Sequence, residues 1–256
     1  MTFPYLSVEE ARQRGGLRMV VVGNVPSPWG EAAKGILHIK DIEWAAVRLV
    51  YDSDALKEWA GGRSGPVAIY EREPPRAGWA EILLLAERLA PTPALLPADP
   101  AERALLFGIA HEICGEEGLG WSRRLQLIDA RMHNAGGFPE QVARYLGRKY
   151  GYRPESGAAA TARVTALLGM LAARLRSQRG QGSRYYLGRS LTAVDVYSAT
   201  FMALFRPLPH ALCPMDPGTR AAFETRDAQT DAALDPLLLE HRDMMYAEHL
   251  EVPLSL

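Results

Sequence analysis

The N-terminal third of the chain alternates between short apolar runs and stretches of helical character. Residues 17–22 are almost continuously apolar and rich in valine, which is typical of a buried central strand. After a short N-terminal helix, strands and helices alternate, and this order indicates an α/β domain. Further strands are predicted at 43–50 and 65–70, and helices at 7–14, 31–40, 55–60 and 79–89.

The rest of the chain has apolar positions at helical spacing and no predicted strand. Prolines gather between the two halves, as in a stiff linker. We therefore expect an α/β domain over residues 1–92, a proline-rich linker over 93–99 and an all-α domain over 100–256. Helices are predicted at 101–114 and 119–133 (possible parts of one bent helix), 138–150, 158–177, 192–204, 221–232 and 236–247.

Two capping boxes mark predicted helix starts. Ser7 is followed three residues later by Glu10, and Thr192 by Asp195. Each pair can satisfy backbone N–H groups that a helix start leaves unpaired. Asp195 is therefore expected to stabilise its helix, by about 1 kcal/mol, and to take no part in catalysis.

Composition narrows the class of protein. The 256 residues carry a net charge of −1, which provides no basic field for nucleic acid. No apolar stretch approaches the roughly 18 residues that span a bilayer, and residues 1–16 lack a signal-peptide core. We therefore expect a cytoplasmic protein that binds neither membrane nor nucleic acid. The histidines lack metal-ligand spacing and Cys114 and Cys213 form no CxxC pair, so no metal site is expected.

The turn Val-Pro-Ser-Pro-Trp-Gly at residues 25–30 carries the candidate chemistry. It joins the first strand to the next helix and places Ser27 at the N-terminus of that helix, with Pro28 in the first turn. Unpaired N–H groups and the helix dipole favour a thiolate or carboxylate at such a position. Serine is also a preferred N-cap residue, so a purely structural role is the alternative.

Three motifs, in this order, resemble the cytosolic glutathione transferase family. Ser-Pro-Trp-Gly at 27–30 resembles the Cys-Pro-aromatic-Ala turn of the omega-like and glutathionyl-hydroquinone-reductase-like classes, with serine in place of cysteine. Gly-Pro-Val at 65–67 falls where the family has its cis-proline, and Leu-Thr-Ala-Val-Asp at 191–195 matches its capping box and hydrophobic staple. The resemblance spans about residues 17–205 and implies a thioredoxin-like α/β domain followed by an all-α domain.

The resemblance implies a binding site for glutathione as co-substrate. The Ser27 hydroxyl would donate a hydrogen bond to the sulfur, which lowers the thiol pKa. Gly65, cis-Pro66 and Val67 would hold the peptide backbone of the thiol in the manner of an added strand. Trp29 would line the same site, with packing inside its domain as the alternative. Serine in place of cysteine disfavours thiol-disulfide exchange.

One position departs from the family pattern. The family usually has Glu-Ser at the start of the third helix of the thioredoxin-like domain, where it binds the γ-glutamyl end of glutathione. Gly78 and Trp79 stand there in this chain, so Trp79 would border the thiol site without a carboxylate or hydroxyl. The family also implies a homodimer.

The helical half would supply the pocket for the second substrate. Trp121, Arg123 and Arg124 fall in the helix that faces the cleft in the family, and either arginine could bind an acidic group of a substrate. The alternative for the arginines is a solvated helix face with salt bridges to Glu116 or Glu117.

Three functions remain open from the sequence. The first is a transferase that activates a thiol, glutathione by resemblance, for attack on an electrophilic small molecule. The second is a non-catalytic, glutathione-transferase-like module that binds ligands or proteins, which the missing Glu-Ser pair favours. The third is a lyase or isomerase that uses the thiol as a cofactor.

Overall fold

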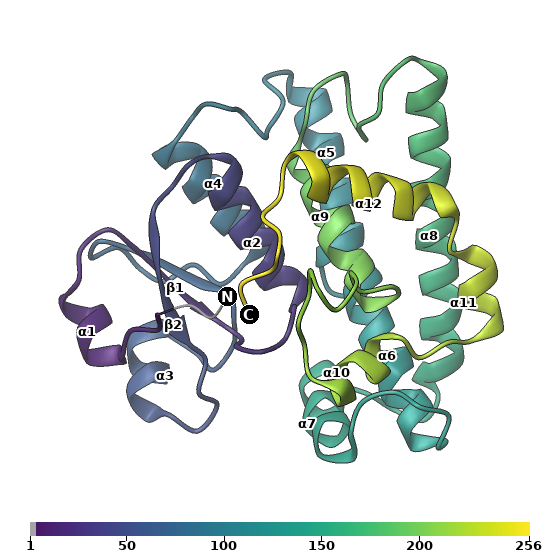
Figure 1. The fold of residues 1–256 in the computed structure, drawn as a ribbon, viewed down its shortest axis with the longest axis horizontal. Coiled ribbons are helices and arrows are strands. Elements are labelled where there is room, and N and C mark those ends of the chain that lie inside the picture. The colour runs from purple at the N-terminus through teal and green to yellow at the C-terminus, as the bar shows by residue number, and fades with distance from the viewer. Residues whose placement is uncertain (1–3) are drawn as a thin grey trace.

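The computed structural model describes residues 4–256. Its sheet has the order β2-β1-β3 (Figure 1). The central strand β1 (Leu17–Val21) pairs in parallel with β2 (Trp44–Arg48) and antiparallel with β3 (Val67–Tyr70). All five residues of β1 are buried, as predicted for a central strand. Helices lie along both faces of this sheet, which explains why its strands are largely apolar.

Four helices accompany the sheet, and side chains on alternate β1 positions belong to different cores. Met19 is part of the large core that continues into the helical half, whereas Val20 belongs to a smaller cluster beneath α1 and α3. This division follows from the two-residue period of a strand. The helices are α1 (Val8–Gln13), α2 (Pro28–Ile39), α3 (Asp54–Ala60) and α4 (Trp79–Leu89).

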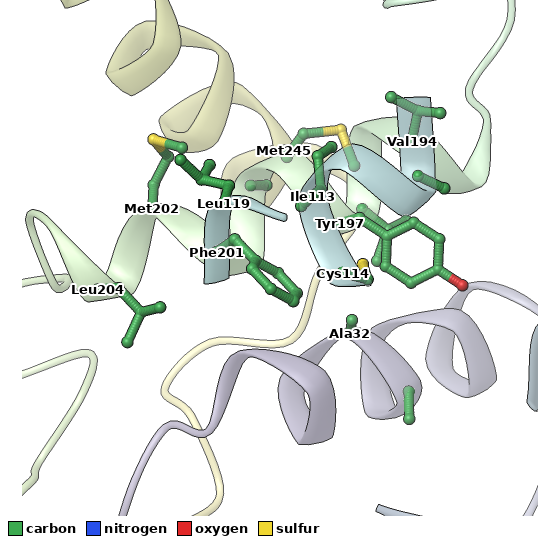
Figure 2. Packing of buried hydrophobic residues seen from close by; sticks show 14 of the residues in the cluster. Ala32, Ile113, Cys114, Leu119, Val194, Tyr197, Phe201, Met202, Leu204 and Met245 are labelled. Carbon is green, nitrogen blue, oxygen red and sulfur yellow. The ribbon is translucent and has the colours of Figure 1, made fainter. Parts of the chain in front are cut away.

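The C-terminal half is entirely helical and packs against α2 (Figure 1). Helix α9 lies at its centre, in contact with α2, α5 and α12. Figure 2 shows Val194, Tyr197 and Phe201 of α9 close to Ile113 of α5 and Met245 of α12. The elements are α5 (Pro100–Cys114), α6 (Leu119–Met132), α7 (Glu140–Tyr150), α8 (Ser156–Gly180), α9 (Ala193–Phe201), the 3₁₀ helix η1 (Met202–Leu204), α10 (Pro217–Phe223), α11 (Ala228–Ala233) and α12 (Pro236–Glu248).

The linker between α4 and α5 is held by a buried cation. Lys40, at the end of α2, donates hydrogen bonds to the carbonyl oxygens of Ala90 (2.8 Å) and Pro93 (2.7 Å) and pairs with Glu87 at 2.7 Å. The predicted linker 93–99 lies between the two helices. The linker backbone is tied down at its N-terminal end, because Lys40 binds the Pro93 carbonyl and Ala193 N donates a hydrogen bond to the Leu95 carbonyl at 3.0 Å.

One alternative left open by the sequence is decided, and one predicted helix was wrong. The predicted helices at 101–114 and 119–133 are two separate helices and not parts of one bent helix, because the chain leaves the helical conformation at Gly115 and Gly118. The predicted helix at 221–232 is two short helices, α10 and α11. Asp216 and Asp227 each accept a hydrogen bond from the backbone N–H three residues ahead, so each starts its own helix.

The sequence was expected to hold no apolar stretch long enough to span a bilayer, but helix α8 is such a stretch. Its length and a mean hydropathy of 1.3 over 18 residues would suffice to cross a membrane. However, Val164, Leu168 and Leu171 are fully buried, and the helix packs against α6, α11 and α12. It is therefore a core helix of the helical half.

Candidate functional site

A cleft of about 780 Å³ lies between the sheet domain and the helical half. One wall is formed by the segments that follow β1 and β2 and by the turn before β3. The other wall is formed by α5, α6 and α7. The carboxyl ends of the parallel strands β1 and β2 meet at one edge of the sheet, so the segments after them reach the same cavity.

Ser27 lines the cleft at the N-terminus of α2. It occupies the N-cap position, with φ −64° and ψ 118°, but its side chain makes no capping hydrogen bond. Its backbone carbonyl accepts from Glu31 N at 2.8 Å, so the helix start is supported by backbone contacts. Among residues 4–256 the Ser27 hydroxyl forms no capping hydrogen bond, and the residue lines the cavity, so its hydroxyl is available to a ligand.

Gly65 and Pro66 line the same cleft as Ser27, and the peptide bond between them is cis. Gly65 lies against the end of β1, because a Cβ atom there would sit 3.4 Å from the Val20 carbonyl oxygen. Val67 begins β3 opposite Val20, is buried in the sheet and does not line the cleft. The structure thus brings Gly65 and Pro66 to the cavity, and leaves the Val67 side chain in the core.

Trp29 lines the cleft and also joins the two halves of the molecule. Its indole N–H donates a hydrogen bond to the Cys114 carbonyl at 2.8 Å, at the end of α5. Its ring meets Phe201 of α9 edge to face, with centroids 4.8 Å apart. The expected packing role is therefore realised between domains and not inside one domain.

Trp79 borders the cleft as the first residue of α4. It packs against Tyr197, whose hydroxyl donates to the Trp79 carbonyl at 3.2 Å, and against Phe107. The Glu81 carboxylate accepts from Gly78 N at 2.9 Å. Where the family pattern has Glu-Ser, this chain therefore presents an aromatic ring and a capped helix start.

Arg123 and Arg124 occupy different environments: the first is buried in the core and the second lines the cleft. Arg123 is only 2% exposed, does not line the cleft, and donates to the carbonyl oxygens of Leu204 (3.0 Å) and Thr225 (2.6 Å). Burial lowers the pKa of its guanidinium to about 10. This residue ties α6 to the segments that follow α9 and α10. Its position does not support the substrate contact that sequence reasoning allowed for it.

Arg124, by contrast, lines the cleft together with Trp121. Its guanidinium carbon lies 4.8 Å from the centre of the Trp29 ring and 5.4 Å from that of Tyr150. Trp121 meets the same tyrosine edge to face, with ring centres 4.5 Å apart. The Nε atom of Arg124 is buried without a hydrogen-bond partner. The predicted salt bridges to Glu116 or Glu117 are not formed among residues 4–256.

Sequence reasoning missed several residues of the cleft wall. Tyr51, Tyr145, Lys149 and Tyr150 all line the cavity. Two signals pointed to them: Tyr51 follows β2, whose end meets the end of β1, and Tyr145 and Lys149 are four residues apart on one predicted helix. Neither signal says which face of α7 points to the cavity.

The cysteines are unsuited to nucleophilic chemistry. Cys114 lies at the cleft wall and Cys213 lies elsewhere in the core, and both are buried free thiols. Burial raises the pKa of the Cys114 thiol well above its usual value and that of Cys213 to about 11. Neither thiol is therefore ionised near neutral pH. In the described part of the chain, no three metal-binding side chains gather in one place.

Known proteins resemble this chain in their three-dimensional fold, but no family-level similarity in sequence is found. Neither a protein-family model nor a curated protein sequence matches the chain. A glutathione S-transferase from Methylobacterium radiotolerans, solved with glutathione sulfonate, superposes with a TM-score of 0.61 at 17% identity, covering 91% of both chains. One from Methylobacillus flagellatus, solved with glutathione bound, gives 0.59 at 12% identity, covering 90% of this chain and 94% of that one.

A glutathione transferase family member from Pseudomonas fluorescens, solved with two glutathione molecules, gives a TM-score of 0.56 at 14% identity. It covers 92% of this chain and 97% of its own. Together with the mixed sheet and the helical half, these superpositions show that the chain has the glutathione transferase fold. The sequence-based prediction of a thioredoxin-like domain followed by an all-α domain is therefore confirmed.

Proposed function

We propose that the chain is a glutathione-transferase-type enzyme, which activates glutathione or a related thiol for attack on an electrophilic small molecule. One observation carries the proposal: Ser27 lines the cleft at the N-terminus of α2, and its hydroxyl is not engaged in capping. An O–H donor and a helix N-terminus at one place both favour an ionised sulfur.

The chemistry follows from the acidity of the thiol. A free thiol has a pKa near 8.5, so only a few per cent is thiolate at pH 7. Bound beside Ser27, the thiol loses its proton to solvent and the sulfur anion accepts the hydroxyl hydrogen bond. The sulfur then forms a bond to the electrophilic carbon, and the leaving group departs with the bonding electron pair. The backbone at Gly65, Pro66 and Val67 would position the thiol peptide.

A non-catalytic binding module is the second candidate, and Gly78 and Trp79 favour it. These residues offer no carboxylate or side-chain hydroxyl for the γ-glutamyl end of glutathione. Two proteins of similar fold were nevertheless solved with glutathione bound. Binding by this chain would then rest on the backbone contacts and on Ser27, and the affinity for glutathione would be correspondingly lower.

We expect the enzyme to act as a cytoplasmic homodimer. Large apolar side chains on α4 and α5, Leu84 and Leu105, are each 43% exposed. Exposed apolar side chains on these two consecutive helices suit an interface with a second copy. Sedimentation of the protein and of a Leu84→Glu, Leu105→Glu double variant tests this, and a wild-type monomer at micromolar concentration would contradict it.

The decisive experiment is a calorimetric titration of glutathione into the wild-type protein and into Ser27→Ala, with the thiolate followed by ultraviolet absorbance. We expect the wild type to bind glutathione and to lower the pKa of the bound thiol. A hydrogen bond to a charged group contributes about 1.5–3 kcal/mol, so Ser27→Ala should raise that pKa by about 1 to 2 units.

Ser7→Ala is the matched control, because Ser7 caps α1 and does not line the cleft. It should leave the thiol pKa unchanged. The absence of binding at millimolar glutathione would exclude glutathione as the thiol and favour the binding module. Binding with an equal thiol pKa in wild type and Ser27→Ala would remove Ser27 from the mechanism.

A further inference from the structure

Two cations face the cleft without a carboxylate partner. Arg124 of α6 and Lys149 of α7 both line it, and within residues 4–256 neither forms an ion pair. The Nε atom of Arg124 has no hydrogen-bond partner at all. The hydrogen bond from Lys149 Nζ goes to a neutral acceptor, Ser64 Oγ, at 2.9 Å. Arg124 is half-buried and Lys149 is exposed, so a cleft lined by these two cations, neither paired with a carboxylate, is suited to an anion.

Arg124 is held in place by rings and not by an acid. Its guanidinium lies over the ring of Trp29 at 4.8 Å and of Tyr150 at 5.4 Å. Cation–π contacts of this kind orient the planar group while leaving N–H donors free for a ligand. The guanidinium is thus preorganised at the cleft wall, which favours binding because less conformational entropy is lost.

The two cations also act on each other. Partial burial of the ammonium group and, second, the charge of Arg124 lower the pKa of Lys149. Like charges repel, and an anion that binds both groups would relieve the repulsion. The only acidic side chain in the lining is Glu116, which is exposed and pairs with neither cation among the described residues.

Aromatic rings surround the same part of the cavity. Tyr51 and Tyr145 meet edge to face with ring centres 5.1 Å apart, and Trp121 meets Tyr150 at 4.5 Å. All four residues line the cleft. Such rings favour packing against a planar apolar group. The ligand that fits both features has an anionic head and an aromatic body.

We infer that the cleft selects aromatic carboxylates as the electrophilic co-substrate, with Arg124 and Lys149 binding the carboxylate while Tyr51, Tyr145 and Trp121 pack against the ring. This inference rests on the proposed transferase function. In the reaction, the thiolate sulfur bonds to the electrophilic ring carbon, and the leaving group, chloride in the probe below, departs with the electron pair. A carboxylate could also come from the C-terminal end of the thiol peptide, so the test separates these two sources.

The first arm measures binding without any thiol. Calorimetry compares 3,5-dinitrobenzoate with its neutral analogue 3,5-dinitrobenzamide on the wild type, Arg124→Gln, Lys149→Gln and the control Arg148→Gln. Arg148 is exposed on α7 and does not line the cleft. We expect the benzoate to bind about tenfold or more tightly than the amide, and each cleft variant to reduce that ratio by about tenfold. Arg148→Gln should preserve it.

Equal affinity for the benzoate and the amide in the wild type would overturn the inference, even if glutathione transfer is active. The exposed position of Lys149 makes Lys149→Gln a usable variant if Arg124→Gln fails to fold.

The second arm compares glutathione with its C-terminal amide. If Arg124→Gln weakens glutathione but neither its amide nor the benzoate, the two cations bind the thiol peptide and the inference fails. The third arm measures glutathione-dependent turnover of 4-chloro-3,5-dinitrobenzoate and neutral 1-chloro-2,4-dinitrobenzene. A preference for the benzoate that Arg124→Gln removes supports the inference. Selective benzoate binding with no turnover of either probe refutes the transferase proposal alone.

Discussion

Ser27 and Cys114 line the same cleft, yet their surroundings have opposite effects on a thiolate: one favours a bound sulfur anion and the other disfavours it. Ser27 lies at a helix start, where N–H groups and the helix dipole favour a bound anion. Cys114 lies at the end of α5, and burial raises the pKa of its thiol well above the usual value. The environment that favours a ligand's thiolate at one residue thus suppresses the protein's own thiolate at the other.

We predict that iodoacetamide labels neither Cys114 nor Cys213 in the native protein at about pH 8, because both folded pKa values lie above the ordinary 8.5. Both thiols should react in urea, and intact-mass spectrometry gives the count. Stoichiometric labelling of the native protein would contradict the burial of these groups.

The raised pKa of the Cys213 thiol determines whether the stability of the protein rises or falls with pH. The folded pKa of Cys213 is about 11, whereas the unfolded thiol ionises near 8.5. The contribution of this group to stability is therefore complete below about pH 8.5 and declines as the pH rises toward the folded value.

At the scale of elements, the two capping boxes share one motif but differ in burial and in the number of hydrogen bonds they form. The box at Ser7 is exposed, with hydrogen bonds of 2.8 and 3.2 Å between Ser7 and Glu10. Asp195 is completely buried and accepts from Thr192 N, from Thr192 Oγ1 and from Tyr186 N. His241 Nε2 lies 3.1 Å from the same carboxylate. Asp195 thus joins α9 to the preceding loop and to α12.

We predict that Asp195→Ala lowers the free energy of unfolding by about 3 kcal/mol or more, because several buried donors lose their acceptor. Ser7→Ala should cost only about 1 kcal/mol. Urea unfolding with linear extrapolation measures both, and Asp195→Asn, which keeps one acceptor oxygen, should fall between them. Similar losses for Asp195→Ala and Ser7→Ala would show that the buried network adds nothing to the cap.

At the scale of the whole molecule, the two halves meet where three helices approach closely. Gly120, in the first turn of α6, has no side chain at the point where Trp29 of α2 and Phe201 of α9 pack together. A Cβ atom on Gly120 would sit 2.4 Å from the Phe201 ring and 2.9 Å from that of Trp29. A methyl group at Gly120 would therefore have to displace an aromatic ring or one of the helices.

Gly120→Ala should therefore destabilise the protein by about 1–3 kcal/mol, through overpacking between the domains. Gly169→Ala is the matched control, because it lies in α8 with open space around it and should gain up to about 1 kcal/mol in helix propensity. Chemical unfolding followed by tryptophan fluorescence compares the two. A Gly120→Ala variant as stable as the wild type would show that the interface can adapt.

The sequence alone determined the strands and helices whose formation depends on residues close together in the chain. The nearly continuous apolar run of β1 indicates a strand buried on both faces, and proline and capping residues mark several helix starts. The position of Ser27 at the start of α2 followed from the strand, turn and helix around it. The order of an α/β domain followed by an all-α domain follows from these signals, because each depends on residues only a few positions apart, whereas the thioredoxin-like fold was implied by the family resemblance.

Tertiary structure alone decided which side chains share the cleft. Arg123 and Arg124 are adjacent in sequence, but one residue of helix turns the side chain by about 100°, so one enters the core and the other lines the cavity. Likewise, Lys149 reaches Ser64, far away in the sequence, only because α7 packs across the cleft from the turn before β3. Helix periodicity defines faces, whereas the packing of one domain on the other decides which face meets the ligand.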